Sequence, residues 1–402
     1  MMAINFARET PLRVSAVEYA GGAGLVMRAM NRKRLRKASA PILIAAAAAM
    51  TLGGCSNAAP PEGAPRVLAG EALGGTAADA IERLFADSEA MGETRALLVL
   101  KDGEVVYEAY GPGYGPQSKL ISWSMAKSIT SVLVGFLVSD GRLALDEPAP
   151  VPAWQRPGDP RGSITLRHLL HMSSGLEHLE TGDPAWEADT VEMLFGEGSA
   201  DMAGMAEAKP AAAQPNEVYN YSSATSVILS DIVARSLTDS EIPAVRRDAV
   251  RNLLLGRLAS PLGMTSLTPE FDAAGTMVGG SIMHATARDY AKFGEFLRRR
   301  GQTADGTRLI PESWVDFMLT PSPADGGYGG HIWLNRPRPA GVGDALWPGR
   351  GPRDIFACLG HQGQFIIVSP SQRLTVVRLG ISRDADQIPN VREALRELMA
   401  AL

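Results

Sequence analysis

Runs of residues typical of β-strands lie near both ends of the chain, and this arrangement limits the folds it can adopt. The runs are 96–100, 105–110, 356–359, 364–368 and 374–379. The first two flank Lys101-Asp102-Gly103-Glu104, and Asp-Gly between two β-rich runs is a strong hairpin signal. We therefore predict an α+β fold in which one antiparallel sheet is built from both ends of the chain.

The middle of the chain, from about residue 142 to 320, has the periodicity of a mostly helical lobe. Helices are predicted after Thr76 as an N-cap, with Ile81, Leu84 and Phe85 on one face, and at 165–172, 222–237, 286–299 and 391–402. The acidic segment 177–210 has no clear assignment. Its methionines (Met193, Met202, Met205) suit either an adaptable surface over a cleft or core packing. A cleft between sheet and helical lobe is a usual place for a ligand site.

Composition excludes some functions. The chain has 402 residues, of which 45% are hydrophobic and 21% charged, so it can form one large domain or two small ones. The net charge of -5 is spread out, and no basic stripe follows the N-terminus, so nucleic acid is not an expected partner. No Walker loop, H-E-x-x-H or paired C-x-x-C occurs, and we expect no cofactor.

The N-terminus has the features of a bacterial export signal. Basic residues at 32–37 precede a short apolar run at 41–52, and Leu52-Gly53-Gly54-Cys55 resembles a lipobox. We expect 1–29 to be a non-native extension before Met30, 30–54 a signal peptide, 55–74 a lipidated Cys55 with a flexible tether, and 75–402 the folded domain. Ser56 after the cysteine suggests, by resemblance, the outer membrane, with the domain facing the periplasm. An ordinary secretory signal is the alternative.

Only two cysteines occur, so a lipidated Cys55 would leave Cys358 alone and exclude a disulfide. Cys358 lies in an apolar run, and we expect it to be a small buried residue rather than a nucleophile.

Ser124 and Lys127 open an amphipathic run that ends at Ser139-Asp140-Gly141. Positions i and i+3 share a helix face, so the Lys127 amine would reach back over the Ser124 hydroxyl. This spacing suits a serine nucleophile activated by an amine. A serine N-cap with a surface lysine one turn later gives the same pattern.

Two further stretches combine with this one. Tyr221-Ser222-Ser223 precedes a predicted helix, and a tyrosine hydroxyl can move protons, although Tyr219 is a rival. Gly360-His361-Gln362-Gly363-Gln364 opens a strand, where glycine permits close approach to a ligand. A core tyrosine and a hairpin turn are the alternatives.

These three stretches, in this order, resemble the serine β-lactamase and penicillin-binding-protein superfamily. The resemblance is closest to its class-C-like branch of esterases and amide hydrolases, which includes the 6-aminohexanoate-dimer hydrolases. Further support comes from residues 164–176, 261–264 and 279–289, and the resemblance covers about 75–385. It implies a β-lactamase-like fold with an antiparallel sheet flanked by helices.

The resemblance also implies roles. Ser124 would form an acyl-enzyme, while Lys127 and Tyr221 would share the general base and acid roles. The backbone N–H groups of Ser124 and Gln364 would form the oxyanion hole. Ser223, His361 and Gly363 would stand in the substrate-binding second and third motifs.

His361 stands where β-lactamases carry a lysine. Losing that permanent cation favours a small neutral ester or amide over substrates with a carboxylate, so we expect weak or absent β-lactam hydrolysis. Segment 177–210 lacks the Trp or Tyr clusters of the 6-aminohexanoate-dimer (nylon-oligomer) hydrolases, so we do not expect that activity. A cell-wall peptidase or β-lactamase, and a non-catalytic envelope receptor that is slowly acylated, are the alternatives.

Three histidines, His168, His171 and His178, lie close together in sequence. No carboxylate stands at ligand spacing to His168 and His171, so we expect these side chains to pack or face solvent rather than bind a metal.

Overall fold

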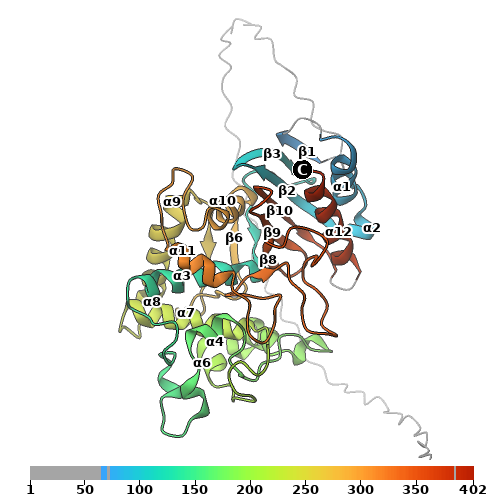
Figure 1. Cartoon of the computed structure of the whole chain (residues 1–402). Helices are drawn as coiled ribbons and strands as arrows, with labels where there is room; N and C mark the ends of the chain where they lie inside the picture. The colour runs from blue at the N-terminus through green and yellow to red at the C-terminus, as the bar shows by residue number, and fades with distance from the viewer. Residues whose placement is uncertain (1–64, 70–72, 384–385) are drawn as a thin grey trace, which may run out of the picture. The chain divides into compact units, whose positions relative to one another are not determined.

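A seven-stranded antiparallel sheet forms one lobe of the computed structural model (Figure 1). The structure describes residues 65–69, 73–383 and 386–402, all within one compact unit, Ala58–Leu402. The strand order is β1 (Arg66–Ala69), β3 (Glu104–Tyr110), β2 (Glu93–Lys101), β10 (Leu374–Ile381), β9 (Gln364–Ser369), β8 (Phe356–Gly360) and β7 (Trp333–Leu334). Pairing of β2 with β10 joins the two ends of the chain and confirms the predicted sheet.

The predicted Asp-Gly hairpin joins β2 to β3. Asp102 and Gly103 both have positive φ, at 56° and 88°, and Lys101 pairs with Glu104. Both central residues of a type I′ turn need φ above zero, which is why Asp-Gly is favoured there.

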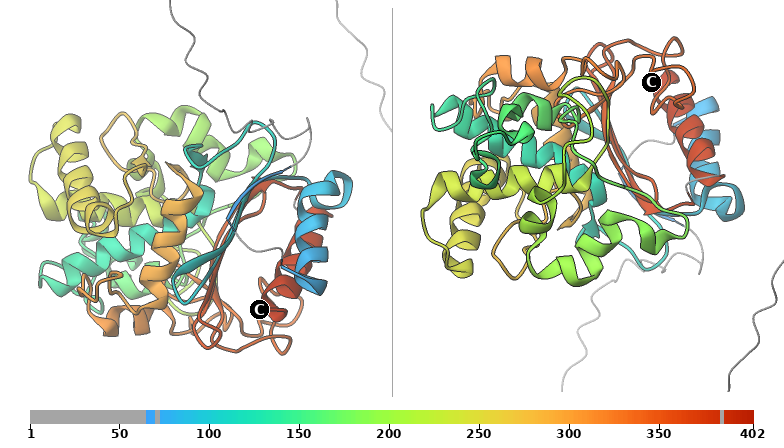
Figure 2. Two further views of the ribbon diagram at one scale, coloured as in Figure 1. Left: turned by 90° about the horizontal axis from the view of Figure 1, so that it is seen from above. Right: turned by 90° about the horizontal axis from the view of Figure 1, so that it is seen from below.

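Each face of the sheet has its own hydrophobic core. Along β2, Leu97 and Val99 belong to one core cluster, while Leu98 and Leu100 belong to the other, because side chains alternate across a strand. Helices α1 (Gly75–Ala86), α2 (Ser88–Met91) and α12 (Gln387–Ala400) lie on one side, and α10 (Ala287–Arg298) packs on the other (Figure 2).

The helical lobe lies on the same side of the sheet as α10 (Figure 2). Its helices are α3 (Ala126–Ser139), α4 (Leu166–Leu170), α5 (Asp189–Phe195), α6 (Met202–Glu207), α7 (Ser223–Leu237), α8 (Pro243–Leu254), α9 (Ser260–Leu262) and α11 (Glu312–Met318). Helix α3 packs on α7, and both are buried along most of their length. Between the lobes lies a small antiparallel sheet, β4 (Leu120–Ile121), β6 (Met283–Ala285) and β5 (Thr268–Pro269).

Several details differ from the sequence prediction. Helix α1 is capped by Gly74 rather than Thr76, and α12 begins at Gln387, four residues before the predicted start. Pro389 lies in the first turn of α12, where proline is tolerated. Residues 66–69 of the predicted tether form β1, which pairs with β3. Two-residue strands such as β7 carry too little pattern to be predicted.

Segment 177–210 folds into α5, α6 and two short 3₁₀ turns, η4 (Ala185–Glu187) and η5 (Glu197–Ala200). Met193 and Met202 are buried in the core, and Met205 packs against it. Of the two predicted uses of these methionines, core packing is therefore correct.

Cys358 lies in β8, buried as predicted, and burial raises the pKa of its thiol to about 12. Residues 1–64 lie outside the described part, so the predictions for the signal peptide and Cys55 are not tested by it. Among the helices formed by the described residues, none has the length and apolar character needed to cross a membrane.

Candidate active site

Ser124 lies in a single 3₁₀ turn, η1 (Trp123–Met125), that leads directly into α3. The preceding residue, Trp123, has φ 44°, which is rare for a bulky side chain. Such a conformation costs about 1–3 kcal/mol, and strained residues of this kind cluster at functional sites. The turn places Ser124 at the N-terminal end of a buried helix, where the helix dipole favours negative charge.

Lys127 is only 1% exposed, and its Nζ makes three hydrogen bonds. The amine lies 3.0 Å from Ser124 Oγ, 2.9 Å from Ser223 Oγ and 2.6 Å from the carbonyl oxygen of Gly280. Burial lowers the pKa of this amine from 10.5 to about 8, while the negative charge of Glu180 acts in the opposite direction. The geometry excludes the alternative of a surface lysine one turn after a cap.

Tyr221, and not Tyr219, lies beside this pair. Lys127 Nζ is 4.8 Å from the centroid of the Tyr221 ring, and Ser124 is close enough to act on the pKa of the Tyr221 hydroxyl. Burial and the nearby Glu180 raise the pKa of Tyr221 well above its usual 10. The hydroxyl of Tyr219 is buried without a hydrogen-bond partner, and its ring packs on Tyr328. The phenol near Ser124 is therefore held in its protonated form.

Ser223 is the first residue of α7, which Ser222 caps by accepting a hydrogen bond from the Thr225 N–H. Its hydroxyl is shared by three neighbours: Lys127 Nζ, Ser281 Oγ at 3.4 Å and Glu180 Oε1 at 2.7 Å. The helix start thus brings a second serine to the Lys127 amine.

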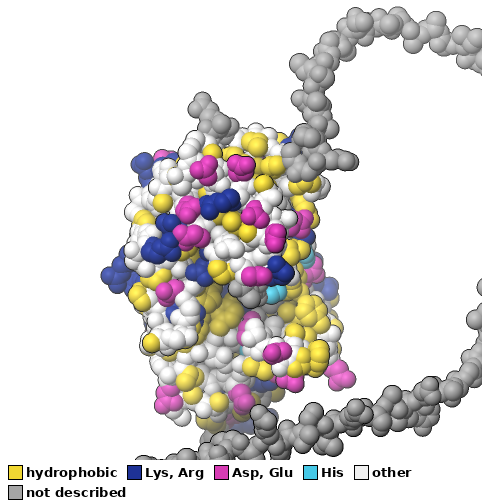
Figure 3. Space-filling view, turned by 90° about the vertical axis from the view of Figure 1, so that its right-hand side faces the viewer, with side chains coloured by type: hydrophobic (Ala, Val, Ile, Leu, Met, Phe, Trp, Pro, Cys, Tyr) yellow, Lys and Arg dark blue, Asp and Glu magenta, His cyan; other side chains and the backbone are white. Residues whose placement is uncertain are grey.

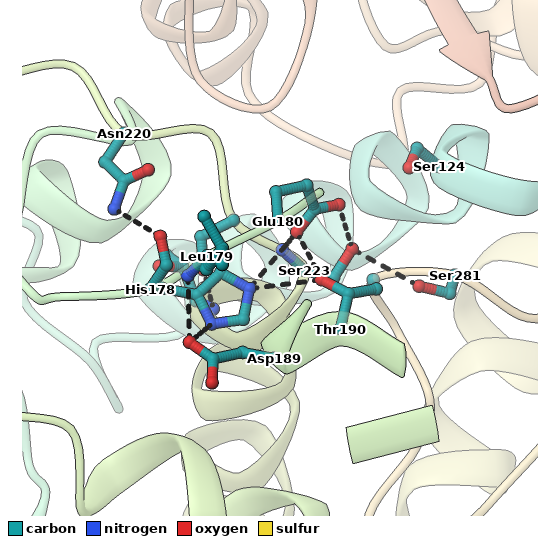
Figure 4. A network of polar contacts seen from close by, with 12 residues as sticks. Ser124, His178, Leu179, Glu180, Asp189, Thr190, Asn220, Ser223 and Ser281 are labelled. Carbon is teal, nitrogen blue, oxygen red and sulfur yellow. Dashed lines mark hydrogen bonds and ion pairs between the residues drawn. The ribbon is translucent and has the colours of Figure 1, made fainter. Parts of the chain in front are cut away.

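Glu180 is a member of the site that sequence reasoning missed. Its carboxylate accepts hydrogen bonds from Ser223 N–H and Ser223 Oγ, both at 2.7 Å, and from Thr190 Oγ1 at 2.8 Å. His178 Nε2 lies 3.2 Å from the same carboxylate, and His178 Nδ1 is 3.7 Å from Asp189 (Figure 4). Burial alone would raise the pKa of Glu180, but these contacts and the Lys127 charge lower it to about 2.

The third motif forms the turn between β8 and β9. A side chain at Gly360 would place its Cβ 2.3 Å from the carbonyl oxygen of Ser122, so this glycine permits contact with the segment before Ser124. Close approach of this turn to a ligand stays a prediction. The ring of His361 meets that of Trp123 edge-on at 5.4 Å. Gly363 has φ 81°, and its carbonyl accepts a hydrogen bond from the buried Arg378.

Gln364 supports this turn with its side chain. The amide donates to the carbonyl oxygens of His361 and Gly380 and accepts a hydrogen bond from the Gly380 N–H. It does not line the cavity that contains Ser124, although His361 does. The oxyanion role of the Gln364 N–H therefore stays a prediction.

A cavity of about 330 Å³ opens beside Ser124. Its polar lining includes Ser124, Glu180, Ser223, Ser281 and His361. The remaining wall is mostly apolar and comes from the segment after Glu180: Ala185, Ala188, Val191, Leu194 and Phe195. One face of the molecule is visibly hollowed, with hydrophobic side chains and a histidine at the border (Figure 3). The site therefore joins a polar reacting centre to an apolar wall.

The three histidines that lie close together in sequence, His168, His171 and His178, contact different partners in the structure. His168 forms a capping box with Thr165, and His171 stacks on Phe317 at 5.0 Å. His178 instead orients Glu180, which the sequence prediction of packing or solvent exposure did not foresee. Within residues 65–69, 73–383 and 386–402, no group of three or more His, Cys, Asp or Glu side chains is arranged to hold a metal ion.

Gly280 and Glu180 both belong to the site, but only Gly280 lies in a stretch of the sequence that resembles a family motif. Gly279-Gly280 lies in the stretch 279–289 that supports the family resemblance. A Cβ at Gly280 would lie 2.7 Å from the Ser223 carbonyl, so only glycine lets its own carbonyl reach Lys127. Glu180 had no such signal, because it is one of several carboxylates in an acidic segment of unassigned structure.

A fold of this kind with Ser, Lys and Tyr side chains grouped at the lobe boundary defines a hydrolase with the β-lactamase fold. The model of the Beta-lactamase family matches residues 81–382, and the chain belongs to this family.

Similar proteins agree with this assignment. The 6-aminohexanoate-dimer hydrolase of Paenarthrobacter ureafaciens is 27% identical over 233 residues, which is 56% of this chain and 57% of that protein. The chain thus matches little more than half the length of this relative. A solved structure from Bacillus anthracis, provisionally assigned as a 6-aminohexanoate-dimer hydrolase, has a TM-score of 0.61 at 21% identity, covering 80% of this chain and 81% of that one. A family VIII carboxylesterase has a TM-score of 0.59 at 15% identity, covering 83% and 100%. These two structures show the shared fold alone.

Proposed function

We propose that the protein hydrolyses small neutral esters or amides through an acyl-enzyme on Ser124. The observation that carries this proposal is the buried Lys127 amine, 3.0 Å from Ser124 Oγ, with its pKa lowered to about 8. A lysine of this kind is neutral in an appreciable fraction of molecules near neutral pH and can act as a base.

In acylation, Lys127 takes the hydroxyl proton of Ser124 while Oγ bonds to the acyl carbon. The carbonyl π electrons move to oxygen, and the anion is stabilised by the N–H of Ser124 in η1, just before α3, together with the predicted N–H of Gln364. When the tetrahedral intermediate collapses, the leaving group departs with a proton supplied through the Tyr221 phenol, which Lys127 reprotonates. Water then repeats these steps and releases the acid.

The raised pKa of Tyr221 supports this division of roles. A raised pKa makes the phenol a weak source of phenolate, so Lys127 is assigned as the base. Tyr221 stays protonated and relays a proton to the leaving group as Lys127 returns one to it. The sequence alone left both assignments open.

The cavity supports a substrate with an apolar acyl part. Its wall of Val191, Leu194 and Phe195 suits an alkyl or aryl chain, and burying each methylene contributes about 0.8 kcal/mol. His361 carries no permanent charge, unlike the lysine usual at this position, and this favours neutral substrates. The name of the carboxylesterase with the same fold is consistent with an ester substrate.

The test is a panel of p-nitrophenyl acetate and butyrate, a p-nitroanilide and the β-lactam nitrocefin, assayed on protein beginning near residue 60. We expect turnover of the ester to exceed that of nitrocefin by a large factor, and Ser124→Ala to abolish it. Ser139→Ala, at the exposed end of the same helix, is the matched control and should leave the rate unchanged. Nitrocefin turnover equal to that of the ester would overturn the substrate class. A lasting acyl adduct without turnover would indicate the acylatable receptor instead.

We also propose that the protein is exported and lipid-anchored on Cys55. The lipobox-like sequence supports this, and so does the position of the folded domain after it. Full-length protein should fractionate with membranes, and Cys55→Ser should move it to the soluble fraction. Recovery of both in the soluble fraction would contradict the anchor.

A further inference from the structure

We propose that Glu180 is a positioning residue that fixes the direction of the Ser223 hydroxyl and thereby aims the lone pair of neutral Lys127 at Ser124. This inference rests on the proposed function, since it concerns how the base is oriented. It assigns a role to a network, drawn in Figure 4, that reaches from the active-site cavity to His178 and Asp189.

The first step is the direction of one hydrogen bond. A serine hydroxyl has a single hydrogen and two acceptor sites. Glu180 is ionised and accepts only, so the hydrogen of Ser223 Oγ points at Oε1, 2.7 Å away. The Ser223 N–H, 2.7 Å from Oε2, holds the same carboxylate from the backbone. Glu180 therefore accepts hydrogen bonds from both donors of Ser223, the N–H and the hydroxyl. Ser223 Oγ can then only accept hydrogen bonds from its other neighbours, Lys127 and Ser281.

The second step follows at Lys127. Its Nζ has three neighbours, of which the Gly280 carbonyl at 2.6 Å and Ser223 Oγ at 2.9 Å are both acceptors in this arrangement. A neutral amine has two hydrogens and one lone pair, and both hydrogens are used by these two acceptors. The lone pair must then face the third neighbour, Ser124 Oγ at 3.0 Å. That is the orientation needed to remove the Ser124 proton.

Glu180 is itself poorly suited to be the base. Thr190 Oγ1 and His178 add to the two contacts from Ser223, so the carboxylate is surrounded by donors. These contacts stabilise the charged form, and the pKa of Glu180 falls to about 2. The carboxylate is thus held in place rather than free to take a proton from water.

Glu180 also influences the charge state of Lys127. The groups that face the amine are the Glu180 carboxylate, the protonated Tyr221 phenol and the buried, neutral His331. Only Glu180 among them is charged, and it favours the ammonium form. Removing its charge should lower the pKa of Lys127, so that the rate reaches its plateau at lower pH.

The test is Glu180→Gln, with pH profiles of kcat/KM for p-nitrophenyl butyrate. An amide cannot accept from both donors of Ser223 at once, so one contact is lost in either orientation. We expect the plateau value of kcat/KM to fall about 10- to 100-fold. The midpoint of the rise in kcat/KM on the acidic side should shift to lower pH by at least half a unit. Glu177→Gln removes the same charge from an exposed position of the same segment and should change neither.

A second variant separates positioning from general damage. Because Glu180 acts through Ser223, adding Glu180→Gln to Ser223→Ala should lower the plateau by less than about threefold further. If the role of Glu180 were purely structural, Glu180→Gln would lower the plateau of kcat/KM and the melting temperature without shifting the pH midpoint. If the two substitutions acted independently, their fold-losses in kcat/KM would multiply in the double variant. Either result would overturn the inference. If Ser124→Ala retained wild-type activity, the proposed function itself would fail, which is a distinguishable outcome.

Discussion

The pH dependence of the unmodified enzyme gives the most quantitative check on the role of Lys127. Burial lowers the pKa of this amine from 10.5 to about 8, which corresponds to about 3 kcal/mol of destabilisation of the ammonium relative to the amine. At pH 7 a lysine with a pKa of about 8 is neutral in about one molecule in ten, against about one in three thousand for a pKa of 10.5.

The neutral amine is the reactive form, so kcat/KM should rise with pH. We expect a nearly tenfold increase for each pH unit below about 7, a midpoint near 8 and a plateau above it. The assay is hydrolysis of p-nitrophenyl butyrate between pH 5.5 and 10, monitored at the isosbestic wavelength of nitrophenol so that product ionisation does not interfere.

Two results would refute this reasoning. A midpoint near 10 or above would mean that Lys127 is not destabilised by burial, or that Tyr221 is the base. A rate independent of pH between 6 and 9 would mean that no group of this pKa limits the reaction.

Three substitutions give further expectations. Tyr221→Phe should lower kcat about 10²- to 10⁴-fold with little change in melting temperature, since it removes a proton donor but keeps the ring, and an unchanged kcat would exclude the acid role. Phe195, 65% exposed at the cavity wall, should set acyl preference, so Phe195→Ser should reduce the butyrate-to-acetate ratio of kcat/KM several-fold, as compared in parallel assays. Gly360→Val places a Cβ 2.3 Å from the Ser122 carbonyl, so it should lower the melting temperature by several degrees and abolish turnover, and a stable, active variant would contradict the packing of β8 against the Ser124 turn.

The local signals in the sequence predicted the sheet well. Asp102-Gly103 specifies a turn that few other pairs can form, and the strand runs at 364–368 and 374–379 are buried on both faces, which leaves a continuous apolar pattern. Residues 66–69 were missed because β1 is an edge strand with exposed side chains, in a stretch whose composition resembles a linker.

The site was predictable where its members are close in sequence. Ser124 and Lys127 lie one turn apart, so helix geometry alone predicts their contact. Glu180 reaches Ser223 from 43 positions away, and its segment lacks a strong helical period, so no local rule could identify it. The base assignment also needed the structure, because burial of Lys127 and Tyr221 sets their pKa values and burial is a property of the packed fold.

The identity of the nucleophile is tested most directly by mapping a covalent adduct. The protein would be treated with a fluorophosphonate probe, digested, and the modified peptide sequenced by mass spectrometry. We expect one adduct per chain, located on Ser124, absent from Ser124→Ala and formed more slowly by Lys127→Met. An adduct on another residue, or equal labelling of Ser124→Ala, would contradict the central claim that Ser124 activated by Lys127 carries the acyl group.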